Sequence, residues 1–317
     1  MKKKTILITD YILTDLSEGL ADNGFEVVYD PVISQEEINH KLPGIHGIIV
    51  NTRTKMDRKR IEMAPILEFI GRLGSGLDII DLDVAQENQV EVISTPEANA
   101  NAVAEHVIGM ILSLARNLNI ADRQVREDVW KREENRGFAL KGKTLGIIGF
   151  GNNGSALGRK VESMDLQVLA YDKYKFNYAD DLMHVRETSQ EDVLQNSDII
   201  SMHVPLTGET EYMVNKNFLN SCRDGVLFIN TSRGKVVRTL DLIQALQSGK
   251  VKAAGLDVFE NEKPETYNSI EQKMYDELHG MKQTILTPHI AGWTYESKKA
   301  ISKILLKKIL NYYADKA

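Results

Sequence analysis

Three side chains in the second half of the sequence could together transfer a proton and bind the carboxylate of a substrate: Arg233, Glu262 and His289. Each follows an apolar run typical of a buried strand, and ligands of open α/β sheets gather at the carboxyl ends of such strands. A carboxylate beside an imidazole raises the pKa of the imidazole, so His289 could give a proton to a carbonyl and take it back. A guanidinium can bind a carboxylate through paired hydrogen bonds. A solvated loop arginine and a structural histidine are the alternatives, and the catalytic interpretation requires that Glu262 and His289 meet.

Two further carboxylates, Asp257 and Glu260, lie close before Glu262 in the sequence. Exposure to water is the interpretation that we favour for Glu260. His289 lies in a loop that proline and glycine flank, not on an apolar helix face. None of this chemistry requires a metal ion.

A second group of residues could bind a dinucleotide. The apolar run 145–148 leads into Gly149-x-Gly151-x-x-Gly154, a helix-compatible stretch follows, and Asp172 closes the next apolar run. In this motif the first glycine permits a tight turn, the second lets a pyrophosphate approach the backbone, and the third lets helix and strand pack closely. The helix N-terminus offers N–H groups to the phosphates. Asp172 would accept from a ribose 2′-hydroxyl and repel a 2′-phosphate.

Short β-branched runs alternate with helical patterns from end to end, which predicts parallel sheets with helices on both faces. The first set of predicted strands is Thr5–Ile8, Phe25–Val28, Gly47–Val50, Phe69–Arg72 and Glu91–Ile93. The second set is Thr144–Ile148, Gln167–Tyr171, Ile199–His203, Val226–Ile229, Ala253–Val258 and Thr284–Leu286. A long helix with Asn101 as its N-cap joins the two sets, and a helix from Ser297 to about Tyr313 returns to the first.

We therefore expect an α/β fold of two doubly wound parallel-sheet domains. A Rossmann NAD-binding domain, residues 100–290, is inserted into a flavodoxin-like substrate domain built from residues 1–99 and 291–317. The position of the glycine motif near the middle of the chain agrees with this arrangement.

Composition narrows the function classes. A net charge of −6 over 317 residues argues against a nucleic-acid footprint. One cysteine, Cys222, excludes an internal disulfide framework and a cysteine-based zinc cluster. No apolar run reaches membrane-spanning length, so a soluble cytoplasmic protein is the expectation.

Taken together, these segments resemble the D-isomer-specific 2-hydroxyacid dehydrogenases along essentially the whole chain. The resemblance implies catalytic roles for Arg233, Glu262 and His289, an active site between the two domains, and a homodimer formed through the NAD domain near Trp130. It also implies NAD as cofactor, with contacts from Gly149, Gly151, Asn152, Asn153, Gly154, Asp172, Val204, Pro205, Thr231, Ser232, Asp257 and Gly292.

Within the family, the chain most resembles the short-form D-3-phosphoglycerate dehydrogenases. By this resemblance the backbone at Ser75 and Gly76 receives the substrate carboxylate together with Arg233, and Arg53, with Arg72 as a further candidate, meets a phosphate. A solvated loop cation is the alternative for Arg53. Glyoxylate/hydroxypyruvate reductase and D-lactate dehydrogenase are alternative activities. An NAD-sensing, corepressor-like binding protein is the alternative from another class.

The chain departs from the family pattern at two places that bear on the site. Asn152 and Asn153 stand where the family usually has a basic and an apolar residue, and Lys263 separates Glu262 from Pro264. The first departure removes an apolar contact to the cofactor, while the second allows a shift of the loop after Glu262.

Overall fold

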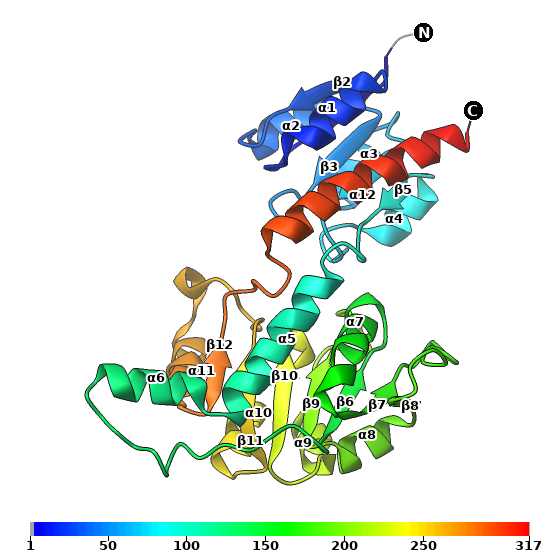
Figure 1. Ribbon diagram of the computed structural model, residues 1–317. Coiled ribbons are helices and arrows are strands. Elements are labelled where there is room, and N and C mark those ends of the chain that lie inside the picture. The colour runs from blue at the N-terminus through cyan, green and yellow to red at the C-terminus, as the bar shows by residue number, and fades with distance from the viewer. Residues whose placement is uncertain (1–2, 317) are drawn as a thin grey trace. The chain divides into compact units, whose positions relative to one another are not determined.

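The computed structural model describes residues 3–316, which divide into two compact units (Figure 1). Unit 1 comprises the described residues up to Asn99 and those from Trp293 onward, while unit 2 runs from Ala100 to Gly292. Each unit is an α/β sandwich around one parallel sheet.

Unit 1 is built on five parallel strands in the order β2-β1-β3-β4-β5. The strands are β1 (Thr5–Ile8), β2 (Glu26–Tyr29), β3 (Gly47–Val50), β4 (Phe69–Arg72) and β5 (Glu91–Ile93). The helices are α1 (Thr14–Asp22), α2 (Gln35–Lys41), α3 (Arg58–Glu62), α4 (Leu82–Glu87) and α12 (Tyr295–Ala314). Side chains of a strand alternate between the two faces, so Leu7 packs against α2, α3 and α4, while Ile6 and Ile8 pack against α1 and α12.

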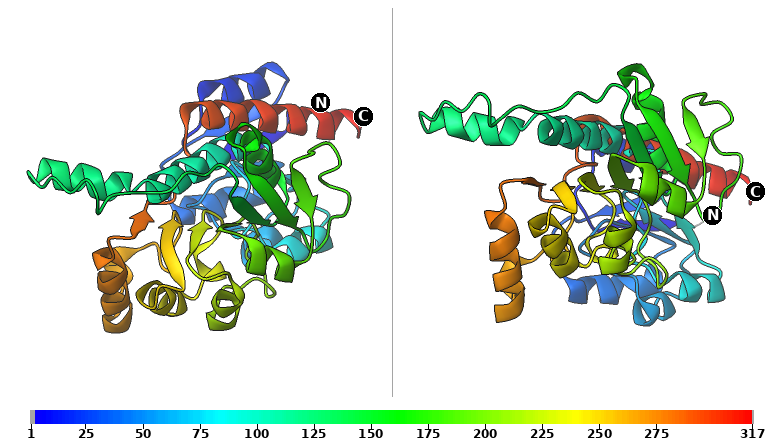
Figure 2. Two further views of the ribbon diagram at one scale, coloured as in Figure 1. Left: turned by 60° about the horizontal axis from the view of Figure 1, so that its bottom comes forward. Right: turned by 90° about the horizontal axis from the view of Figure 1, so that it is seen from below.

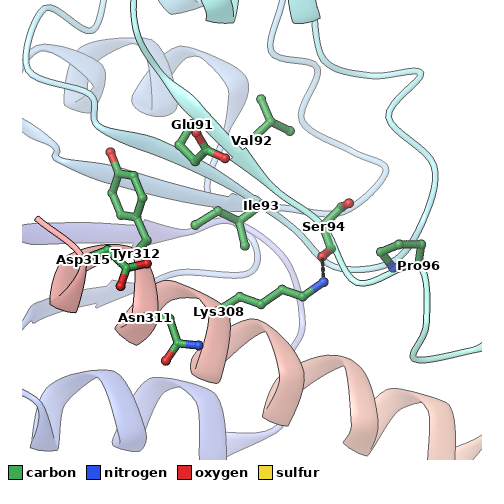
Figure 3. Close-up of a pocket in the computed structure, with 9 residues that line it drawn as sticks. All are labelled: Glu91, Val92, Ile93, Ser94, Pro96, Lys308, Asn311, Tyr312 and Asp315. Carbon is green, nitrogen blue, oxygen red and sulfur yellow. Dashed lines mark hydrogen bonds between the residues drawn. The ribbon is translucent and has the colours of Figure 1, made fainter.

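Helix α12 joins unit 1 although it comes from the far end of the sequence. Its buried Leu305 and Ile309 pack in the same cluster as Leu16 and Phe69, and Figures 1 and 2 show α12 beside α1. A pocket of about 420 Å³ separates α12 from the edge strand β5 (Figure 3). Lys308 spans it and donates to the Ser94 carbonyl at 2.8 Å. None of the predicted site residues lines this pocket.

Unit 2 is built on seven parallel strands in the order β12-β11-β10-β9-β6-β7-β8. The strands are β6 (Thr144–Ile148), β7 (Gln167–Tyr171), β8 (Val185–Glu187), β9 (Ile199–Met202), β10 (Val226–Asn230), β11 (Val251–Leu256) and β12 (Thr284–Leu286). The helices are α5 (Ala100–Ala115), α6 (Leu118–Arg126), α7 (Asn152–Lys160), α8 (Gln190–Asn196), α9 (Lys216–Ser221), α10 (Thr239–Gln247) and α11 (Ser269–Gly280). This order is the Rossmann order with one strand added at the β12 edge. From β6 the chain adds β7 and β8 on one side and then continues with β9 on the other side, so the switch point of the sheet lies between β6 and β9.

Apolar side chains cover both faces of the second sheet. Helices α5 and α7 pack on one face against Leu145 and Ile147, and helices α8 to α11 pack on the other against Ile200 and Phe228. The predicted fold class, two doubly wound parallel sheets with a Rossmann unit, is confirmed.

Two local predictions were wrong. Helix α5 begins at Ala100, so Asn101 lies inside the first turn, and its amide donates to Glu105 at 2.9 Å instead of capping the helix. The edge strand β8 was not predicted.

Candidate active site

The glycine motif forms the turn between β6 and α7. Gly149 has a φ of +90°, and a Cβ there would lie 2.5 Å from the His203 carbonyl oxygen. At Gly154 a Cβ would lie 2.1 Å from the Gly149 carbonyl oxygen, whereas a Cβ at Gly151 would meet nothing within 4 Å. Two glycines therefore let the backbone pass close to other atoms, and the third faces open space, as the dinucleotide motif requires for the approach of a pyrophosphate.

Asn152 and Asn153 occupy the first two positions of α7, where backbone N–H groups have no partner within the helix. The Oδ1 atom of Asn153 is buried and accepts no hydrogen bond within the described residues. The backbone N–H groups fit an anionic group of a dinucleotide at this helix end, whereas the Asn153 Oδ1 atom, an acceptor, calls for a hydrogen-bond donor. The unusual Asn152-Asn153 pair changes side chains only, and the backbone donors remain.

Asp172 follows β7 and faces the same turn. Its Oδ2 accepts from the Phe150 N–H at 2.8 Å, and its Oδ1 accepts from the N–H groups of Tyr174 and Lys175. The carboxylate is therefore fixed beside the glycine turn, where the motif requires it.

Val204 and Pro205 follow β9, the strand next to β6 at the switch point of the sheet. Val204 lies close to the glycine turn, since its Cγ1 atom would be 3.1 Å from a Cβ on Gly149. His203, just before them, places its Nε2 atom 2.8 Å from the Ser201 hydroxyl. Burial lowers the pKa of His203 to about 4, so this imidazole stays neutral at pH 7.

The segment after β10 is a tight turn that Asn230 organises. The Asn230 Oδ1 atom accepts from the backbone N–H and the hydroxyl of Ser232, and its amide donates to the Arg233 carbonyl. Thr231 is buried, and its hydroxyl has no partner within the described part of the chain. The turn presents Arg233, whose Nη1 donates to the Ser232 carbonyl at 2.7 Å.

Glu262 and His289 meet, with 2.9 Å between Glu262 Oε2 and His289 Nδ1. The hydrogen bond that His289 donates to Glu262 raises the pKa of His289 above its ordinary value, although partial burial and the charge of Arg233 oppose it. Partial burial acts to raise the pKa of Glu262, but the His289 hydrogen bond and charge lower it overall. Lys263 has not moved Glu262 out of register. The pair borders a pocket of about 340 Å³.

The other two carboxylates of this segment have different partners. Asp257 is fully buried, and its oxygens accept from the N–H groups of Ile290 and Ala291 at 2.9 and 2.8 Å. Its contact with NAD stays a prediction. Our interpretation of Glu260 as a solvated carboxylate was wrong: its Oε1 accepts from the Thr239 N–H at the start of α10, and its Oε2 accepts from the Tyr212 hydroxyl.

The predicted substrate residues of unit 1 lie at the carboxyl ends of β3 and β4. Arg53 donates to the carbonyls of Pro31 and Ile33. Arg72 donates from its Nε to the Gly76 carbonyl at 2.7 Å and from its Nη1 to Asn51 Oδ1 at 2.8 Å. Both guanidinium groups therefore hold loops of their own unit, which the sequence did not indicate. Ser75 and Gly76 form part of the loop that Arg72 fixes, and both are half-buried.

Sequence reasoning missed two residues beside this site, His106 and Thr287. The Nε2 atom of His106 lies 3.1 Å from the Thr287 hydroxyl oxygen. Among residues 3–316 no group of three or more His, Cys, Asp and Glu side chains could hold a metal ion. No helix of the described residues has the length and apolar character needed to cross a membrane.

Residues 108–291 match the family model described as the NAD binding domain of D-isomer specific 2-hydroxyacid dehydrogenases. The chain is 34% identical to D-3-phosphoglycerate dehydrogenase of Archaeoglobus fulgidus over 306 residues, which cover 96% of this chain and 56% of that relative. It is 35% identical to hydroxypyruvate reductase of Thermotoga maritima over 277 residues, which cover 87% of this chain and 88% of that relative.

Among solved structures, the fold is similar to D-lactate dehydrogenase from Aquifex aeolicus, complexed with NAD and lactic acid. The TM-score is 0.84 at 30% identity, with 98% of this chain and 96% of that chain covered. A glyoxylate reductase from Paecilomyes thermophila has a TM-score of 0.86 at 25% identity over 98% of this chain and 95% of that chain. The chain belongs to the D-isomer specific 2-hydroxyacid dehydrogenase family.

Proposed function

We propose that this protein is an NAD-dependent oxidoreductase that interconverts a D-2-hydroxy acid and the corresponding 2-keto acid. The observation that carries the proposal is the contact between Glu262 and His289, with the raised pKa of His289. This pair, Arg233 and the glycine turn all follow the carboxyl ends of strands in one sheet, the edge at which such sheets bind ligands.

The proposed chemistry assigns one role to each residue. NAD(H), when bound, supplies or accepts the hydride. Because Nδ1 of His289 is engaged with Glu262, Nε2 is the atom that gives a proton to the keto oxygen and takes it back in the reverse direction. Glu262 holds the ring and stabilises its charged form. Arg233 binds the substrate carboxylate and polarises the adjacent carbonyl.

For the substrate we propose 3-phosphoglycerate and 3-phosphohydroxypyruvate, which the similarity to the phosphoglycerate dehydrogenase of Archaeoglobus fulgidus supports. Hydroxypyruvate is the second candidate. The engagement of Arg53 and Arg72 with backbone carbonyls favours it, since a phosphate would compete with those carbonyls for the same guanidinium groups.

Replacing His289 by alanine removes the proton donor. We expect the rate of NADH-dependent keto-acid reduction to fall about 10²- to 10⁴-fold, while NADH binding is unchanged. Steady-state kinetics and fluorescence titration with NADH measure the two effects. His279→Ala, a histidine that lines the same pocket from α11, is the control and should keep wild-type activity. Wild-type turnover by His289→Ala would remove His289 from the mechanism.

Glu262→Gln should move the pH dependence of reduction. Reduction requires the imidazolium form of His289, whose fraction falls as the pH rises through its pKa. The pKa is raised in the wild type, so the midpoint of the falling limb of kcat/KM should move to lower pH in the variant. Glu265→Gln, an exposed carboxylate three residues further on, should leave the midpoint in place. An unmoved midpoint in Glu262→Gln would contradict the assigned role of Glu262.

A kinetic comparison of 3-phosphohydroxypyruvate, hydroxypyruvate, glyoxylate and pyruvate with NADH tests the substrate. The largest kcat/KM is expected for 3-phosphohydroxypyruvate, and Arg53→Ala should reduce it for this substrate more than for hydroxypyruvate. A preference for hydroxypyruvate that Arg53→Ala leaves intact would establish the second candidate. Tight NADH binding without turnover of any of these acids would favour a binding protein instead.

We also propose that the chain forms a homodimer through unit 2. Helix α6 has no buried residues, and it and the segment after it expose Leu118, Val125 and Trp130 (84% exposed). Figures 1 and 2 show this segment extending from the body of unit 2. An exposed apolar surface of this kind is typical of a subunit contact.

Sedimentation velocity tests the dimer. The wild type should sediment with twice the mass of the chain, and Trp130→Ser should shift the population toward single chains. Leu240→Ser, which changes an exposed leucine on α10, is the matched control. A wild type that sediments as a single chain would reject the dimer.

A further inference from the structure

His106 lies in α5, far in sequence from the candidate active site, yet it faces the loop that carries His289. Its side chain is 21% exposed, and its Nε2 lies 3.1 Å from the Thr287 hydroxyl oxygen and 3.7 Å from Asp257 Oδ1. The Thr287 hydroxyl in turn lies 2.5 Å from the same Asp257 oxygen. The three side chains therefore form a short polar chain within unit 2.

The direction of the hydrogen bonds in this polar chain follows from Asp257, the carboxylate at its inner end. An ionised carboxylate only accepts, so the Thr287 hydroxyl donates to Asp257 Oδ1. The hydroxyl oxygen then accepts from His106, which requires that the imidazole carry a proton on Nε2. His106 is thus the outer donor in a chain that ends on a buried charge.

Asp257 fixes the backbone of the His289 loop. Its carbonyl accepts from the His289 N–H at 2.7 Å, and its side chain accepts from the next two N–H groups, those of Ile290 and Ala291. His289 has a φ of +55°, in the left-handed region that is unfavourable for a residue with a Cβ. Such a conformation persists only where several surrounding contacts hold it, and here the hydrogen bonds of Asp257 to three successive N–H groups do so.

We propose that His106 and Thr287 are positioning residues for the reaction: they orient the Asp257 carboxylate, which holds the His289 loop so that the imidazole stays against Glu262. The proposal rests on the proposed function for its kinetic consequences. The structural part of the proposal, the position of the His289 ring against Glu262, can be tested in the protein without cofactor or substrate. Neither residue is assigned contact with the reacting atoms.

The experiment compares Thr287→Val, which keeps the shape and loses the hydroxyl, with Thr287→Ser, which keeps the hydroxyl. The NMR titration of the His289 ring is followed in the free protein, with His289→Ala identifying its signal among the seven histidines. The charged groups that act on His289 are Glu262, Arg233 and Asp257. In Thr287→Val the pKa of His289 should fall toward its ordinary value, because the ring loses its fixed place against Glu262.

The kinetic arm separates positioning from folding. A displaced catalytic group loses on the order of 10- to 100-fold in rate, so kcat should fall by that order in Thr287→Val. KM should change little. The melting temperature should fall, because the buried Asp257 carboxylate loses a hydrogen-bond donor, so kcat is compared at a temperature at which the variant is folded. Thr287→Ser should retain the wild-type values. His106→Leu should reproduce Thr287→Val, and His106→Gln, which keeps an N–H donor, should restore much of kcat.

Unchanged His289 titration and kcat in a folded Thr287→Val variant would overturn the proposal. Equal losses in Thr287→Ser and Thr287→Val would also overturn it, since the hydroxyl would not then be the active feature. If Thr287→Val does not fold, His106→Leu and His106→Gln give the same comparison at a partly exposed position. If the proposed function is wrong, the wild type will show no turnover. The NMR titration of His289 then still tests whether Thr287 and His106 position the His289 ring.

Discussion

A single buried carboxylate determines where the candidate acid–base group lies. An ionised side chain out of contact with water is stable only when hydrogen-bond donors surround it. Asp257 meets this requirement with N–H groups and a hydroxyl from the loop after β12. The need of one charge for partners thus fixes the backbone around His289, which in turn sets the distance to Glu262.

The three carboxylates after β11 show what a sequence can and cannot reveal. Their position at the end of a buried strand was sufficient to predict a polar site, and the contact between Glu262 and His289 that the catalytic interpretation requires is found. Their separate roles depend on which element stands opposite. Asp257 faces the loop after β12, whereas Glu260 faces the start of α10. Those neighbours come from other parts of the chain, so local pattern could not assign Asp257 or Glu260.

The fold followed from pattern wherever apolar periodicity was strong. Strands β1, β6 and β7 have the predicted bounds. Strand β8 was missed because it is short and only Val185 in it is buried. The residue type of Asn101 suits an N-cap, but helix α5 begins one residue earlier, at Ala100. The contacts of Arg53 depend on carbonyls in a distant loop, which no local signal reports.

Because unit 2 is inserted between two segments of unit 1, the two units can complete their folding at different times during synthesis. A ribosome releases all of unit 2 as one continuous stretch, so this unit can fold while the chain is still growing. Unit 1 must wait for α12, because Leu305 and Ile309 cover apolar side chains of strands made near the beginning. Until then, the face of its sheet around Phe69 has α1 but not α12 to cover it. A helix that is translated after unit 2 thus completes a sheet whose strands are translated before unit 2.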